Sequence, residues 1–303
     1  MRVQHLNATS PLSAGICLAA AMHIGPAALA QAPPDTITLM AVVRDFLERT
    51  EPGGHPDFER EDDADGFTVR AVAETIGSDR KPVWQSQGER VKRKSGDYVQ
   101  WEDSMGRNIC HYLHGPGDGQ AGKTDPGMEP NFTTKANFDL WYRDVPGVNI
   151  STIIELTLVR QADDTYVFDS DVDPFYMARG GFFPIDDQLF GNSEANDSHN
   201  YHFTTEIHTS FKYDASAGQL FKFDGDDDVF VFINGKLVID LGGTHGSAGS
   251  QYVDLNRLGL TDGDTYPLDL FNAERMTNGS NYAFQTNLIL KDRLISTISA
   301  AFD

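Results

Sequence analysis

Residues 221–240 have the sequence FKFDGDDDVFVFINGKLVID, and this stretch decides the fold class. An apolar run, Val229–Ile233, follows a group of aspartates and predicts a buried strand. Asn234-Gly235 then predicts a type I′ turn, because these residue types adopt left-handed backbone angles most readily. A second strand returns through Lys236–Asp240. The stretch therefore predicts a β-hairpin with crowded carboxylates at its mouth.

Four aspartates stand at this mouth, Asp224 and the run Asp226–Asp228. Carboxylates so close repel one another unless positive charge lies among them, and a hard cation such as calcium, held by oxygen ligands, would supply it. The alternating spacing resembles an EF-hand loop, but Val229 replaces the required glycine and Gly235 the closing glutamate. The alternative interpretation is a solvated acidic turn without an ion.

Asp169, Asp171 and Asp173 repeat the same spacing further upstream. Pro174 and Gly180 stand at the two positions where an EF-hand needs glycine and glutamate. This second group predicts a solvated turn.

The composition limits the classes of partner. The chain has 303 residues, 40% of them hydrophobic, which is enough for a sizeable core. Its 45 acidic and 24 basic residues give a formal charge of −21. Such a surface repels phosphate backbones and anionic membranes, so neither nucleic acid nor membrane insertion is expected. Divalent cations and neutral polysaccharides remain compatible, although acidity alone also serves solubility.

The N-terminus predicts export. Arg2 is followed by the short apolar segment Leu12–Ala21 and by an A-x-A-like cleavage site at Ala28–Ala30. Residues 1–30 are therefore expected to be a signal peptide, and the protein to be secreted or to lie at the cell surface. Cys110 would be the single cysteine left, which excludes an intramolecular disulfide and a cysteine-based metal site.

Short strands separated by Gly, Asn and Asp turns predict an all-β sandwich or barrel. The predicted strands are Thr36–Phe46, Ile153–Val159, Thr165–Asp169, Tyr201–Tyr213, Leu220–Phe223, Val229–Ile233, Lys236–Asp240, Thr265–Glu274 and Tyr282–Leu290. Loops are expected at 50–66 and 114–130, and a short helix at Asn131–Tyr142. One continuous domain, 36–292, and a short tail, 293–303, follow from this pattern.

Catalytic motifs are absent from the sequence. It contains no Gly-x-Ser-x-Gly elbow, His-Glu-x-x-His helix or phosphate-binding loop. A glycosidase needs two facing carboxylates, and Glu206 and Glu274 are the acids on convincing strands. Glu274 next to Arg275 instead predicts an ion pair at a strand end. The protein is expected not to be an enzyme, and a hydrolase with an unrecognised acid pair is the weakest alternative.

Residues 223–246, FDGDDDVFVFINGKLVIDLGGTHG, resemble the signature of the fibro-slime domain. Other segments that carry the resemblance are VRDF (43–46), HPDF (55–58), NFDLWY (137–142), FFPID (182–186), HNYHFTTE (199–206), LFNAER (270–275) and GSNY (279–282). The resemblance covers nearly all of the chain after the expected signal peptide.

This resemblance implies a mainly β fold, an antiparallel β-barrel or sandwich of the anthrax protective-antigen type with loop-rich N-terminal elaborations. Yeast flocculins and slime-mould prespore-inducing factors share that barrel. Residues 200–292 would carry the calcium-site half. In the lectin members, two consecutive aspartates joined by a cis peptide bind calcium, and the ion coordinates sugar hydroxyls. The matching pair is Asp226-Asp227, and the partner asparagine is Asn278 or Asn281, of which Asn281 is closer to the strand.

Two departures from the lectins matter. Asp228 stands where the barrel family often has glycine, which adds a candidate ligand or obstructs the sugar, and the lectins' disulfides are missing. The predicted function is a secreted, calcium-dependent carbohydrate-binding or adhesion module of the cell surface or extracellular matrix. His245, Asn278 and Asn281 would contact the polysaccharide or glycan. The first alternative is a purely structural, self-assembling matrix component whose partners are other matrix proteins.

Overall fold

In the computed structural model of the chain, the apolar run at 229–233 lies in β10 (Asp228–Ile233), which is buried on both faces. Val229, Val231 and Ile233 point into one hydrophobic core. Phe230 and Phe232 point into a second core on the opposite face. Because successive side chains of a strand alternate between faces, a strand between two cores must be apolar throughout. This explains why the run is not interrupted by polar residues.

The structure describes residues 32–60, 68–90, 101–102, 108–109, 131–193, 198–244, 249–277 and 279–292, and every strand within these ranges belongs to one unit, Pro34–Asp303. The main sheet contains β1 (Thr36–Phe46), β6 (Asn149–Arg160), β7 (Tyr166–Asp169), β8 (Phe203–Lys212), β9 (Leu220–Gly225), β10, β11 (Lys236–Leu241), β12 (Gly249–Asp254), β13 (Thr265–Glu274), β14 (Tyr282–Thr286) and β15 (Lys291–Asp292).

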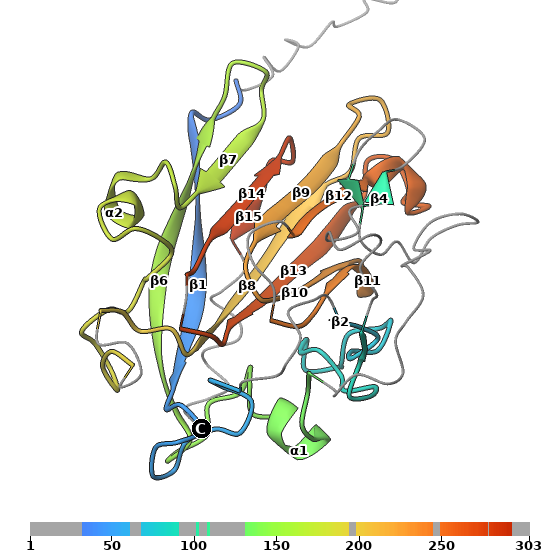
Figure 1. Cartoon of the computed structure of the whole chain (residues 1–303). Coiled ribbons are helices and arrows are strands. Elements are labelled where there is room, and N and C mark those ends of the chain that lie inside the picture. Colours follow the sequence, from blue (N-terminus) through green and yellow to red (C-terminus); the bar gives the residue numbers. More distant parts are fainter. Residues whose placement is uncertain are drawn as a thin grey trace, which may run out of the picture. The chain divides into compact units, whose positions relative to one another are not determined.

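These strands pair antiparallel in the order β11-β10-β13-β8-β1-β6-β7-β14-β9-β12, with β15 beside β8 (Figure 1). The two ends of this path, β11 and β12, contact each other, so the sheet nearly closes into a barrel. The first core lies on the inner face of the sheet. The predicted fold class, a mainly β antiparallel barrel, is confirmed.

Loop-rich segments between β1 and β6 cover the outer face of β10 and β13. They bury a second core made of Phe46, Phe58, Phe132, Phe138, Trp141, Tyr142, Phe230, Phe232, Leu237, Phe271 and smaller or partly buried apolar neighbours that include Ala71 and Val72. Most of these aromatic rings meet edge-to-face or tilted, as Phe138 and Trp141 do at 5.0 Å. The N-terminal elaborations are therefore packed against the barrel by a core of their own.

The remaining elements are small. They are the hairpin strands β2 (Thr68–Val69) and β3 (Glu89–Arg90), the pair β4 (Trp101–Glu102) and β5 (Asn108–Ile109), helices α1 (Lys135–Phe138) and α2 (Pro174–Met177), and a 3₁₀ turn at Leu255–Arg257. Among the described residues, no helix has the length and hydrophobicity needed to cross a bilayer.

Two predicted elements are shorter in the structure by four residues or more. Helix α1 covers four residues because Thr134 caps its start and Trp141 leaves the helical line to pack, fully buried, in the second core. Strand β14 stops at Thr286 rather than at residue 290. There the Asn287 side chain accepts the Leu220 N–H, so a side chain replaces the next rung of the ladder.

Candidate functional site

The aspartate run lies where β9 passes into β10, at one end of the sheet. Asp227 adopts a left-handed conformation, with φ of 52°. The described residues contain no cis peptide bond, so the Asp226-Asp227 bond is trans and not cis as the resemblance implied. A left-handed residue between two extended ones sends neighbouring side chains in different directions. The three carboxylates of the run consequently have different partners.

Asp228 and Asp227 both contact Arg275, the residue that follows β13. The Arg275 Nε donates to Asp228 Oδ2 at 2.5 Å, and the Arg275 backbone N–H donates to Asp227 Oδ2 at 2.7 Å. The other Asp228 oxygen accepts the Gly243 N–H at 2.7 Å. The predicted ion pair between Glu274 and Arg275 is wrong, because the guanidinium pairs with Asp228 instead. Part of the positive charge expected among the aspartates is thus a buried guanidinium.

Arg275 also joins this loop to the second core. Its side chain is fully buried and lies 5.3 Å from the Phe132 ring and 5.1 Å from the Trp141 ring. Its Nη1 donates to the backbone carbonyls of Asp57 and Asn131, at 3.2 and 3.3 Å. Cation–π contacts and carbonyl acceptors satisfy a guanidinium that is buried away from solvent. The position of Asp228 therefore depends on the N-terminal elaborations.

Asp226 faces another direction and meets Asn281. The Asp226 N–H donates to the Asn281 carbonyl at 3.0 Å, and Asn281 Nδ2 donates to Asp226 Oδ2 at 2.9 Å. Asp226 is only 7% exposed, and its Oδ1 has no hydrogen-bond partner in the described part of the chain. Of the two candidate asparagines, Asn281 is placed beside the aspartates. Asn278 and His245 lie outside the described residues, as does Cys110.

Burial perturbs the protonation of these carboxyl groups. It raises the pKa of Asp226 to about 6 and that of Asp227 to about 7. Burial, followed by repulsion from Asp227 and Asp226, holds the pKa of Glu274 well above its usual value. Burial also raises the pKa of Asp228, although the Arg275 guanidinium opposes that shift. The loop therefore holds more carboxylate than one guanidinium neutralises, and a bound cation would favour the ionised forms.

Carboxylate groups alone do not make a calcium site at this loop. Within the described ranges, no three His, Cys, Asp or Glu side chains lie close enough together to hold a metal ion. Asp228 is already committed to Arg275. The unpartnered Asp226 Oδ1 and the adjoining Asn281 amide are hard oxygen ligands that suit calcium, which also accepts backbone carbonyls. Asp226 and Asn281 therefore offer oxygen ligands of the kind calcium accepts, whereas the expected ligand Asp227 accepts the Arg275 N–H.

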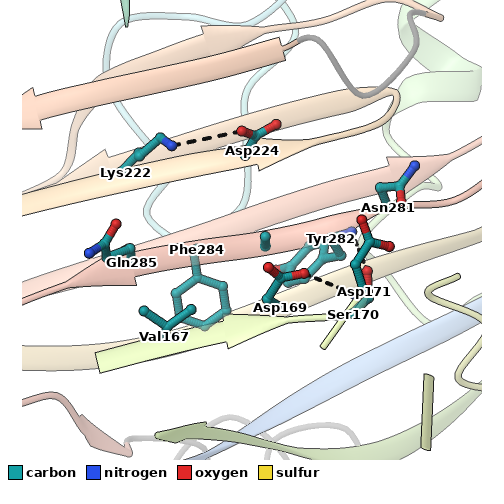
Figure 2. Close-up of a pocket in the computed structure, with 11 residues that line it drawn as sticks. Val167, Asp169, Ser170, Asp171, Lys222, Asp224, Asn281, Tyr282, Phe284 and Gln285 are labelled. Carbon is teal, nitrogen blue, oxygen red and sulfur yellow. Dashed lines mark hydrogen bonds and ion pairs between the residues drawn. The ribbon is translucent and has the colours of Figure 1, made fainter. Parts of the chain in front are cut away.

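A pocket of about 270 Å³ lies beside Asn281 on the outer face of β7, β14 and β9 (Figure 2). It is lined by Val167, Asp169, Ser170, Asp171, Lys222, Asp224, Asn281, Tyr282, Ala283, Phe284 and Gln285. Asp169 and Asp171, predicted to form a solvated turn, are part of its wall. Asp173 instead caps α2, where it accepts the Phe175 N–H at 2.9 Å.

The two candidate catalytic acids lie elsewhere. Glu206 is 1% exposed, accepts Arg44 Nη1 at 2.7 Å and also contacts Lys81 and His208. Burial opposes its ionisation, but the His208 hydrogen bond and the Arg44 and Lys81 charges outweigh burial and lower the Glu206 pKa. Glu274 is 2% exposed and does not line the pocket. Neither acid lines the pocket described above, so this pocket gives the hydrolase alternative no support.

Comparisons with known proteins agree with this fold. Residues 184–300 match the model of the PA14 domain family. The chain is 34% identical over 264 residues to protein psiD of Dictyostelium discoideum and 32% identical over 263 residues to protein psiC of the same organism. These alignments cover 85% and 84% of this chain but 42% of each relative. The chain therefore spans about two fifths of the length of these relatives.

Among solved structures, the chain is similar to the PA14 domain of the MpAFP antifreeze protein at 16% identity. The match covers 44% of this chain and 69% of that one, with a TM-score of 0.22. So low a score carries no argument beyond the family match.

Proposed function

Residues 184–300 match the PA14 domain family, and from this premise we propose that the protein is an exported, calcium-dependent carbohydrate-binding or adhesion module of the cell surface or extracellular matrix. The observation that carries the proposal is the unpartnered, buried Asp226 Oδ1 beside Asn281, at the edge of an open pocket. A buried carboxylate oxygen without a donor is costly and suits a cation.

In this proposal Asp226, Asp227 and Asn281 hold the ion. When bound, calcium would neutralise the loop and offer coordination positions to vicinal sugar hydroxyls. Asp228 has a different task, because its ion pair with Arg275 fixes the start of β10 beside the second core. Asn281 links the two parts of the site, since it contacts Asp226 and also lines the pocket. His245 and Asn278 remain proposed sugar contacts.

Calorimetric titration of calcium into the protein tests the ion site. We expect saturable binding by the wild type and loss of binding in Asp226→Asn/Asp227→Asn. The matched control is Asp164→Asn/Asp139→Asn, which removes two exposed carboxylates distant in sequence from the aspartate run, and it should bind calcium normally. No binding by the wild type would overturn the calcium mechanism.

A glycan array probed with the same proteins, with calcium and with a chelator, tests recognition. Calcium-dependent binding to neutral glycans that is absent from the double variant supports the proposal. Calcium binding without any glycan signal would favour the structural matrix alternative.

A further inference from the structure

The pocket has a regular plan that follows from strand register. On β14, Ala283 pairs with Asp224 of β9 on one side and with Asp169 of β7 on the other. Two residues further along, Gln285 pairs in the same way with Lys222 and Val167. Side chains at alternate positions share a face, so both rows point outward from the barrel. The central position of the first row is an alanine, which leaves a hollow between two aspartates.

A third row closes the hollow at the aspartate run. The Asp226 N–H bonds to the Asn281 carbonyl and the Ser170 N–H to the Tyr282 carbonyl, so the ladders continue past Tyr282. Asp226, two residues after Asp224, belongs to the same outward face. Figure 2 shows Asp171 and Asn281 close together at this end of the pocket, with Asp224 across from them.

The hollow thus combines two kinds of chemistry. Three pocket-lining carboxylates, Asp169, Asp171 and Asp224, face a single cation, Lys222, whose Nζ lies 3.8 Å from Asp224. The unpartnered Oδ1 of Asp226, more than nine-tenths buried, belongs to the neighbouring residue of the same face, next to Asn281 and outside the residues that line the hollow. Between the acids stand the amides of Asn281 and Gln285, which can donate to and accept from hydroxyl groups.

We propose that this hollow binds a cationic amino sugar, with the ammonium group among Asp171, Asp224 and Asp169 and the ring over Ala283. The inference rests on the proposed carbohydrate-binding function and names the class of sugar. A ligand with both an ammonium and several hydroxyl groups matches carboxylates alternating with amides, whereas a neutral sugar would supply hydroxyl donors but no positive charge opposite the carboxylates. The volume of about 270 Å³ is at the small end of small-molecule pockets, which suits one sugar unit.

The test measures binding of chitosan oligomers and of their fully N-acetylated counterparts to the full chain, with calcium and with a chelator. We expect the deacetylated oligomer to bind at least about tenfold more tightly, since a charge-assisted hydrogen bond contributes roughly 1.5–3 kcal/mol. Asp171→Asn/Asp224→Asn should abolish this preference, and Ala283→Leu, which fills the hollow, should weaken both ligands. Lys222→Gln should strengthen binding of the cationic oligomer.

Asp164→Asn/Asp139→Asn provides the control for lost charge, and thermal unfolding of each variant checks that the fold is intact. Equal binding of both oligomers, or a preference for the acetylated one, would overturn the amino-sugar inference and leave carbohydrate binding in place. Binding of neither oligomer nor any other glycan would defeat the proposed function itself. Loss of calcium binding in Asp171→Asn/Asp224→Asn without a change in oligomer preference would make the hollow a metal site and overturn the inference. Binding of a polyamine equal to that of the chitosan oligomer would do the same, because the hydroxyl groups would then contribute nothing.

Discussion

At the scale of single residues, Arg275 determines how the aspartate run is arranged. It pairs with Asp228, binds Asp227 through its backbone and lies against two aromatic rings, all in the interior. We expect Arg275→Met to lower the free energy of unfolding by about 3–5 kcal/mol, because it leaves the Asp228 carboxylate buried without its partner. Urea denaturation measures this change.

Arg275→Met/Asp228→Asn is the companion to that variant. It removes the orphaned charge as well as the guanidinium, so it should recover part of the lost stability. If the double variant is as unstable as the sum of the two single variants, the ion pair is not the source of the effect.

Asp240, at the end of β11, gives a pH-dependent prediction. One of its oxygens accepts the Arg70 N–H at 2.8 Å, the other has no partner in the described part of the structure, and burial raises its pKa from 3.8 to about 7. The folded state therefore binds this proton more tightly than the unfolded state, and stability falls as pH rises from about 4 to about 7. Asp240→Asn should raise the free energy of unfolding by roughly 1–3 kcal/mol at pH 8 and change it little near pH 4. A benefit that does not change with pH would contradict this.

Calcium affinity should also depend on pH. The pKa values of Asp226 and Asp227 are raised to about 6 and about 7, so protons compete with the ion as pH falls below about 7. We expect calcium binding at least about tenfold weaker at pH 5.5 than at pH 8, measured by calorimetry in the same buffer system. Equal affinity at both pH values would mean that other groups hold the ion.

At the scale of elements, the turn of the β10–β11 hairpin allows the effect of backbone conformation on stability to be measured separately from that of packing. Asn234 and Gly235 have φ of 52° and 74°, as the predicted type I′ turn requires. A Cβ added at Gly235 would lie 3.6 Å from the Ile76 side chain, which is an ordinary van der Waals contact. Gly235→Ala should therefore lower the free energy of unfolding by about 1 kcal/mol, because alanine disfavours the left-handed backbone conformation. In Gly225→Ala, by contrast, the new Cβ would lie 2.5 Å from the Asn281 carbonyl oxygen. This variant should therefore lose more stability than Gly235→Ala. Thermal unfolding measures both losses, and the melting temperature should fall further in Gly225→Ala than in Gly235→Ala.

The sequence predicts correctly those strands whose apolar residues and bounding turns lie close together in the chain. Thr36–Phe46 and Thr265–Glu274 form strands with the predicted bounds, because their apolar residues and flanking turns lie within each segment. The partnership of Arg275 with Asp228 spans 47 positions, so no local pattern indicates it.

The acids of the pocket illustrate the same limit. Asp169 and Asp224 come together only through their separate pairings with β14, which depend on strand order. Alternation along the chain does place Asp224 and Asp226 on one face, and that alternation is the local signal of the pocket wall.

At the scale of the whole molecule, the segment that matches the PA14 model contains only part of the barrel. Residues 184–300 lack β1, β6 and β7, which stand between β8 and β14 in the sheet. They also lack the aromatic residues that cover Phe230 and Phe271 in the second core. We expect residues 34–303 to unfold cooperatively in calorimetry and residues 184–300 to show no cooperative transition. A sharp transition in the shorter protein would show that β1, β6, β7 and the N-terminal elaborations are not needed for cooperative folding.

Strand β1 lies between β6 and β8, and this position has a consequence for biosynthesis. Arg44 of β1 binds Glu206 of β8, 162 positions later in the chain. At roughly 5–20 residues per second, a ribosome needs about 10–30 s to make that partner after it has made β1. Strand β6 is made before β8, so during this interval the edge of β1 that pairs with β8 has no partner in the nascent chain, and unpaired edges promote aggregation. A chaperone that holds the strand until translation reaches β8 should therefore raise the yield of folded protein more than one that acts after release.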